Sequence, residues 1–215
     1  MLAAWLVAAV AAFPPSGTYN YDAALNGSPV GRWSVAVKSG QNGSEVDETS
    51  TATLAGLALS AQAALVLDVN LAPASYAGHY RTPGQSPNVS VSLTPQSATV
   101  AGAFNAQPQQ VALQNETRHF VVIEPGLLAG LFVLPAQLAA WKEQSVTWIT
   151  PTTAQVHVLE VAVASPPPRP NAVPAGDNVL SIAQPIAVTI WYDPSTLVPD
   201  EIEVPSQAAV LTRVR

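Results

Sequence analysis

The chain has 215 residues, of which 48% are hydrophobic and 10% are charged, whereas ordinary soluble domains carry about 25% charged residues. The net charge of −6 with only eight Lys and Arg excludes a nucleic-acid surface, because such a surface needs clustered basic side chains to displace counterions from phosphates. The sequence has no cysteine, which excludes disulfides, Cys-based zinc sites, iron–sulfur clusters and a thiol nucleophile.

An apolar run near the N-terminus, from Leu2 to Phe13, resembles an export signal. It is shorter than the roughly 20 residues that span a bilayer. Small residues at Ala9-Val10-Ala11 and Val10-Ala11-Ala12 have the spacing of a signal-peptidase site. We therefore expect residues 1–12 to be a cleaved signal peptide and the protein to be periplasmic or secreted. A buried N-terminal helix is the alternative.

Two-residue alternation of apolar and polar side chains, typical of half-buried strands, begins at Thr18. An Asn26-Gly27 turn between two such runs predicts a hairpin. A polar, Thr-rich strand follows at residues 45–54. After Gly56, every second residue from Leu57 to Leu71 is apolar, which predicts one long strand.

Shorter strands separated by turns are expected through the rest of the chain. Turns are predicted at Pro83-Gly84, Thr94-Pro95 and Gln107-Pro108, and a bulge near Leu159. The expected strands are residues 75–81, 88–93, 98–104, 110–114, 145–150, 154–164, 186–192, 197–204 and 209–214.

A Pro-rich loop is expected at residues 165–175. It is interpreted as a stiff loop rather than a domain boundary, because the chain beyond it is too short to form an independent core. Residues 17–215 are therefore predicted to form a single β-rich domain.

One stretch favours a helix over a strand. After a β-like run at His119–Ile123 and a Glu124-Pro125-Gly126 break, residues 126–141 are almost wholly apolar. A helix that is hydrophobic around most of its circumference is buried, and Pro135 should kink it or start a second segment.

Together, these elements predict a mainly β fold. We expect an antiparallel meander that forms a curved sheet or unclosed barrel, with one kinked helix packed in its concave face. A two-sheet sandwich is the alternative.

Residues with catalytic or metal-binding chemistry are sparse. His79, His119 and His157 lie far apart and outside any metal-ligand spacing, so no metal site and no cofactor are expected. The sequence has no GxSxG nucleophile motif. Glu124 is either a buried acid with a raised pKa or a carboxylate marking a helix start, and the helix start is favoured.

Two clusters of acidic residues lie at turns or in polar strands, where solvated charge is the expected state. They are Glu45, Asp47 and Glu48, and Asp200, Glu201 and Glu203.

Three local features occur together: Gly31 and Trp33 after a Pro29-Val30 turn, the strand-to-helix step VVIEPGLLAGLFVLPAQL, and WYDPSTLV at residues 191–198. The set resembles uncharacterised bacterial secreted or envelope proteins of unknown function, whose fold is similar to the lipoprotein-localisation-factor open β-barrel. The resemblance implies an unclosed antiparallel barrel with a helical plug, export and lipid binding, and it assigns no catalytic residue. The chain lacks the lipobox Cys of lipoprotein members.

The hypothesis that follows is an exported, non-catalytic β-rich envelope protein that binds a lipid, another apolar ligand or a lipidated envelope partner between sheet and helix. A structural or interaction module with a filled core and an envelope hydrolase are the alternatives. No nucleic-acid partner and no further transmembrane span are expected. The predicted cavity wall consists of Leu127, Leu128, Leu131, Phe132, Leu138, Trp141 and Trp33.

Overall fold

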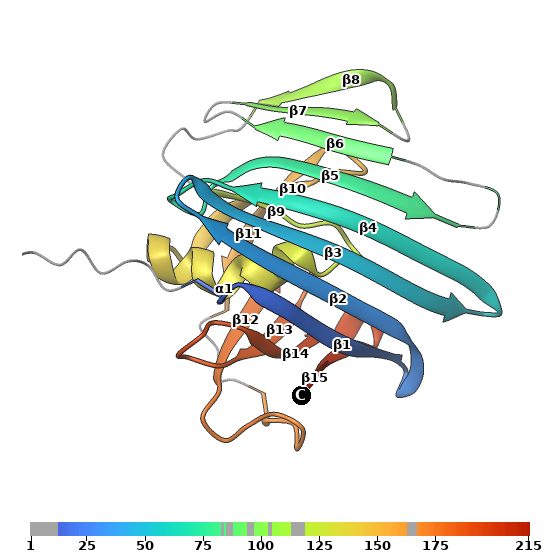
Figure 1. Cartoon of the computed structure of the whole chain (residues 1–215), viewed down its shortest axis with the longest axis vertical. Helices are drawn as coiled ribbons and strands as arrows, with labels where there is room; N and C mark the ends of the chain where they lie inside the picture. Colours follow the sequence, from blue (N-terminus) through green and yellow to red (C-terminus); the bar gives the residue numbers. More distant parts are fainter. Residues whose placement is uncertain are drawn as a thin grey trace, which may run out of the picture.

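The structure, a computed structural model, describes residues 13–82, 84, 88–93, 97–102, 105–112, 119–162 and 167–215. Within these residues, fifteen strands form one sheet, and a single α-helix, α1 (Ala129–Trp141), packs against it (Figure 1). A 3-10 turn covers Pro205–Gln207. The strands are β1 (Gly17–Leu25), β2 (Ser28–Gly40), β3 (Gly43–Leu54), β4 (Leu57–Leu67), β5 (Pro73–Arg81), β6 (Asn88–Leu93), β7 (Ser97–Gly102), β8 (Asn105–Ala112), β9 (Phe120–Val122), β10 (Ser145–Thr150), β11 (Gln155–Val161), β12 (Asn178–Gln184), β13 (Val188–Tyr192), β14 (Pro199–Val204) and β15 (Ala209–Val214).

Two meanders make up the sheet, in the order β8-β7-β6-β5-β4-β3-β2-β1-β15-β14-β13-β12-β11-β10-β9. The first runs from β1 outward to one edge at β8. The second starts at the opposite edge with β9, which pairs with β10 in parallel, and returns to the centre, where β15 pairs with β1 antiparallel. The first and last strands are therefore neighbours in the middle of the sheet.

The sheet is curved and does not close into a barrel. Its edge strands β8 and β9 are not neighbours in the hydrogen-bonded order, yet β9 lies against β5. Figure 1 shows the sheet curling back so that β9 and β10 lie behind β4 and β5 in this view. The predicted fold class, a mainly β curved sheet or unclosed barrel with one helix, is confirmed, and the sandwich alternative is wrong.

The helix α1 lies in the concave face, where it contacts β3, β4, β9 and β13. It approaches the sheet closely at Gly130, where an added Cβ would lie 2.1 Å from the Val122 carbonyl oxygen. Its residues are buried from Ala129 to Leu138. The sheet supplies the facing core from alternate, inward positions such as Val46 and Leu65.

Pro135 lies within α1, and no second helical segment starts there. The far end of the helix is anchored to the turn after β4 by side-chain hydrogen bonds. Gln137 Nε2 donates to the Leu71 carbonyl and Trp141 Nε1 donates to the Asn70 carbonyl, both at 2.8 Å.

The predicted long strand from Leu57 to Leu71 ends at Leu67. The Asp68 carboxylate accepts hydrogen bonds from the backbone N–H groups of Asn70 and Ala72 at 2.8 and 2.9 Å, a local arrangement that replaces the strand ladder with a turn. Leu71 takes a positive φ of 63°. Alternation alone did not reveal this break.

One further expectation about the strands is wrong, and one strand was not predicted. Gln107-Pro108 is not a turn, because Pro108 lies inside β8. That strand is at the sheet edge, where a missing N–H is tolerated. The sequence also gave no indication of β12, which places only Leu180 and Ile182 in the core. The bulge expected near Leu159 corresponds to a register shift between Glu160 and Val161.

In the described part of the chain, no helix is long and apolar enough to cross a membrane. The expected signal peptide at residues 1–12 lies outside the described residues.

Candidate functional site

A cavity of about 170 Å³ lies between the start of α1 and one end of the curved sheet. We call it the apolar cavity. Its wall is formed by the ends of β1, β2, β3, β14 and β15 and by the turn before the helix. The lining residues are Ala23, Ala24, Leu25, Val30, Trp33, Ala52, Leu54, Gly126, Leu127, Leu128, Leu131, Val204, Gln207, Ala209, Val210 and Leu211.

Turns converge at this end of the sheet. The β1–β2 turn has positive φ at Asn26 and Gly27 (50° and 74°), which matches the two-residue hairpin type favoured by strand twist. Asn26 N–H donates to the Ala208 carbonyl at 2.9 Å, which fixes the β1–β2 turn against the β14–β15 turn. Small residues such as Ala52 and Ala209 line the cavity near these turns, so space remains beside the helix.

Trp33 fixes one side of the apolar cavity. Its indole Nε1 donates to the Gly126 carbonyl at 3.3 Å, which ties the Glu124-Pro125-Gly126 turn to β2. The positive φ of Gly126, 84°, suits glycine at this position. This contact joins the sheet to the segment that leads into α1.

The N-terminus of α1, directly behind the cavity wall, is capped by a carboxylate from β3. Glu48 Oε2 accepts hydrogen bonds from the backbone N–H groups of Leu128 and Ala129, both at 2.7 Å. These are among the N–H groups that have no partner within a helix, and the helix has no side-chain cap of its own. Glu48 faces Ala63, which in turn pairs with Gly78, and these small residues leave room for the carboxylate.

Burial dominates the electrostatics of Glu48, whose exposed fraction is 1%. It raises the pKa of the carboxyl group to about 7, although the two backbone hydrogen bonds act in the opposite direction. The second oxygen, Oε1, has no hydrogen-bond partner. The hydroxyl groups of Tyr76 and Tyr80 hydrogen-bond to each other at 2.8 Å, and burial raises the pKa of both phenols.

Glu124 does not cap the helix, and the favoured interpretation of this residue is wrong. Its carboxylate accepts hydrogen bonds from Thr152 N–H at 2.8 Å and from Thr152 Oγ1 at 2.5 Å. The Pro125-Gly126 turn delays the helix to Ala129, which leaves the capping position to Glu48. Burial raises the pKa of Glu124 as well.

The acidic clusters are not uniformly solvated, so the expectation for them is wrong in part. Glu48, Asp200 and Glu201 are all buried. Asp200 is ion-paired with Arg213 at 3.3 Å and with Arg215 at 3.0 Å. Thr212 Oγ1 donates to Glu201 at 3.1 Å. The partners of Asp200 and Glu201 lie on β15 or directly after it, and β15 pairs with β14. Aligning the two predicted strands as a hairpin would have predicted these contacts.

The structure brings together four of the seven residues predicted to line a cavity: Trp33, Leu127, Leu128 and Leu131. The other three lie elsewhere. Phe132 is fully buried in the core and packs against the rings of Tyr19 and Tyr21, with centroids at 5.2 and 6.4 Å. Leu138 is in the same core. Trp141, near the other end of α1, stacks on His119 with centroids at 4.3 Å.

Most of the sheet's contribution to the cavity was missed by sequence reasoning. Leu25, Val30 and Leu54 line it, and all three are apolar residues next to turns. The sequence feature that could have identified them is a large apolar side chain at the end of a strand, where polar residues are common.

The histidines lie in separate places. His79 forms a hydrogen bond with Asn88 on the outer face, His119 with Glu143 at 2.8 Å, and His157 packs edge-on to Trp148. In the residues that the structure describes, no three His, Cys, Asp or Glu side chains are grouped so as to hold a metal ion.

No family model matches this chain, and no curated protein matches it in sequence. Among solved structures, the chain is similar to a β-barrel-like protein of the domain-of-unknown-function family DUF1849 from Brucella abortus. The TM-score is 0.60 at 10% identity, and the match covers 95% of this chain and 98% of that one. A DUF1089 family protein from Pseudomonas aeruginosa matches with a TM-score of 0.48 at 8% identity, over 96% and 97% of the two chains. At such identities, the first likeness shows the fold alone.

Proposed function

We propose that this protein is a non-catalytic binding module that takes an apolar group of a lipid, such as the end of one acyl chain, into the apolar cavity. The observation that carries the proposal is the lining, in which fifteen of the sixteen residues are Gly, Ala, Val, Leu or Trp and only Gln207 has a polar side chain. Pockets that bind small molecules are mostly apolar in the same way.

Size limits what the cavity accepts. An apolar cavity of roughly 150 Å³ holds a molecule such as benzene, so about 170 Å³ suits an aromatic ring or the last few methylenes of a chain. The remainder of a lipid would lie outside, near the β3–β4 turn. There Leu57 is 52% exposed and pairs with the cavity residue Leu54.

Two observations favour binding over catalysis. The buried acids nearest the start of α1, Glu48 and Glu124, are engaged in hydrogen bonds that hold the helix and the β10–β11 turn. The cavity itself contributes no ionisable side chain. Its chemistry therefore supports recognition of an apolar group.

Export is part of the proposal, with residues 1–12 as a signal peptide and a lipid or a lipidated envelope protein as the partner. The apolar run and its small-x-small ends support it. N-terminal sequencing of the protein from its native host would test it. The mature chain is expected to begin at Ala12 or Phe13, and a chain that retains residues 1–12 would contradict export by cleavage.

Binding can be tested by displacement of the fluorescent probe 1-aminoanthracene with fatty acids of increasing length. The wild-type protein is expected to bind the probe and to release it when a fatty acid competes. Ala52→Phe places a ring at the cavity wall and is expected to weaken binding by about tenfold or more, equivalent to about 1.4 kcal/mol.

A matched control is Ala77→Phe, the same substitution on the opposite face of the sheet, where the side chain is exposed. It should bind like the wild type. If neither the probe nor any fatty acid binds the wild-type protein, the cavity is not a lipid site, and the filled-core interaction module becomes the better account.

A further inference from the structure

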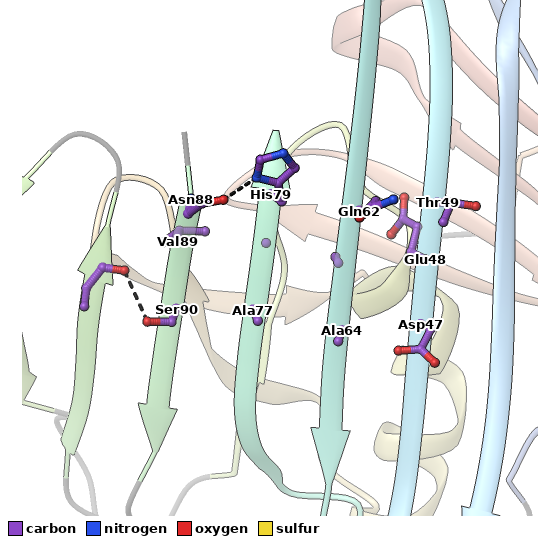
Figure 2. A pocket seen from close by; sticks show the side chains of 13 residues that line it. Asp47, Glu48, Thr49, Gln62, Ala64, Ala77, His79, Asn88, Val89 and Ser90 are labelled. Carbon is purple, nitrogen blue, oxygen red and sulfur yellow. Dashed lines mark hydrogen bonds between the residues drawn. The ribbon is translucent and has the colours of Figure 1, made fainter. Parts of the chain in front are cut away.

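A second, shallow and open hollow, of about 770 Å³, lies on the face of β3–β7 opposite to α1. We call it the outer trough. Figure 2 shows its side chains in two rows that cross the strands, with Thr49, Gln62, His79 and Asn88 in one row and Asp47, Ala64, Ala77 and Ser90 in the other.

Strand register makes the first row continuous. Thr49 pairs with Gln62, Gln62 with His79, and His79 with Asn88. With neighbouring strands about 4.8 Å apart, the row spans about 14 Å. The hydrogen bond between His79 Nδ1 and Asn88 Oδ1 orients both side chains. Every member of the row has a side chain that is able to donate or accept hydrogen bonds.

The second row consists mostly of residues with small side chains. Ala64 pairs with Ala77, Ala77 with Ser90, and Ser90 with Ala101. Alanine is depleted in strands, where β-branched and aromatic residues pack better. Three alanines in a run of four residues across the sheet therefore give up local stability, and Ala64 and Ala77, which are direct neighbours, form an apolar floor beside the polar row.

The outer trough is close to electrically neutral. Asp47 is the one acid among its lining residues whose side chain lies on this face, and its carboxylate is paired with Lys38 at 2.7 Å. The other acid in the lining, Glu48, extends to the opposite face, where it caps α1. Phosphate-bearing ligands are disfavoured because no cation of the lining is available for them, and the polar row disfavours a lipid.

A ligand that fits must offer many uncharged hydrogen-bonding groups along one edge and C–H groups over an apolar floor. Sugars have both features, because hydroxyl groups project around the ring and the ring faces carry C–H groups. We propose that the outer trough binds a neutral oligosaccharide, with Gln62, His79 and Asn88 hydrogen-bonding to its hydroxyl groups and Ala64 and Ala77 under its rings. The trough and the apolar cavity are on opposite faces of the sheet, so this site is independent of the lipid site.

Affinity gel electrophoresis with soluble neutral polysaccharides (a β-glucan, a galactomannan and a dextran) would test this proposal, with anionic polygalacturonate for comparison. At least one neutral polymer is expected to retard the wild-type protein. Ala77→Phe, which fills the floor, and Gln62→Ala, which removes hydrogen bonds, are each expected to raise the dissociation constant by about tenfold.

The matched control is Ala58→Phe, at an exposed position of the same strand as Ala64 but outside the outer trough. It should run like the wild type, as should Ala52→Phe in the apolar cavity. The proposal is overturned if no neutral polymer retards the wild type, if only polygalacturonate does, or if Gln62→Ala binds unchanged. Gln62 is exposed, and Gln62→Ala tests the polar row without adding bulk to the face of the sheet.

Discussion

Glu48 links the sheet to the helix through a single carboxylate. Two N–H groups of α1 depend on it, and leaving buried donors without partners is costly. Replacing Glu48 with Ala is therefore expected to lower the free energy of unfolding by about 2–4 kcal/mol at pH 5, from loss of the cap and from the space left behind. Urea denaturation followed by circular dichroism would measure it.

The matched control for this loss is Thr49→Ala, one residue along β3 on the exposed face. Such a substitution is expected to change stability by no more than about 0.5 kcal/mol. An equal loss in the two variants would contradict the capping role of Glu48.

The same residue predicts how stability depends on pH. The pKa of Glu48 is raised from 4.5 to about 7 by burial, so the folded protein holds this proton more tightly than the unfolded chain. The associated stability is present in full below pH 4.5 and is lost as the pH rises through 7. A shift of this size corresponds to about 3 kcal/mol.

We therefore expect the free energy of unfolding to fall between pH 4.5 and pH 8, and to fall less in Glu48→Gln. Buried Glu124 and partly buried Asp177 also have raised pKa values, chiefly from desolvation, and contribute in the same direction. The difference in slope between Glu48→Gln and wild type isolates the contribution of Glu48. Parallel curves for the two proteins would show that Glu48 does not titrate in this range.

At the scale of elements, the position of α1 depends on how closely it approaches β9. An added Cβ at Gly130 would meet the Val122 carbonyl oxygen at 2.1 Å, and backbone on both sides has little freedom to move. Gly130→Ala is expected to lower the melting temperature, because a steric cost of about 1–3 kcal/mol exceeds the gain in helix propensity of about 1 kcal/mol.

Gly176→Ala is the control for this prediction, since nothing lies within 4 Å of a Cβ added there. It should leave the melting temperature unchanged or raise it slightly. A Gly130→Ala protein that melts with the wild type would contradict the close helix–strand contact.

Local sequence patterns predicted the helix and strands better than the contacts between them. The strand expected at residues 209–214 has the observed bounds of β15, and the apolar stretch after Gly126 predicted α1. The cap could not be predicted in the same way, because Glu48 and Leu128 are 80 residues apart and their meeting depends on how far the sheet curls.

The two walls of the apolar cavity also differ in how well the sequence predicts them. Its helix wall, with Leu127 and Leu131, follows from the density of apolar residues in one short stretch. The sheet wall, with Leu25 and Leu211, depends on β1 pairing with β15, which no local pattern encodes.

For the molecule as a whole, the order of the strands predicts which strands unfold locally most easily. Among the strands that the structure describes, β1 and β15 each have neighbours on both sides, whereas β8 has one neighbour at the edge. Regions with fewer supporting contacts open locally with a lower free energy. Hydrogen exchange measured by mass spectrometry is expected to show slow exchange in β1 and β15 and much faster exchange in β7 and β8.

Exchange in β7 and β8 as slow as in β1 would contradict this gradient. Exchange in β9, the other edge strand, should be slower than in β8. It lies against β5 and α1, which restrict its opening.

The pairing of β1 with β15 also has a consequence for the order of events during synthesis. The Tyr21 hydroxyl donates to the Pro199 carbonyl at 2.7 Å, across 178 positions of sequence. While the ribosome is still making the chain, β1 has β2 on one side and a bare edge on the other, and bare edges invite wrong pairing. The sheet is complete only after β15 has emerged. Nearly the whole chain must therefore be made before β1 and β15 can pair at the centre of the sheet. Contacts of such long range fold slowly, which leaves the edge of β1 without a partner until the last strand has paired with it.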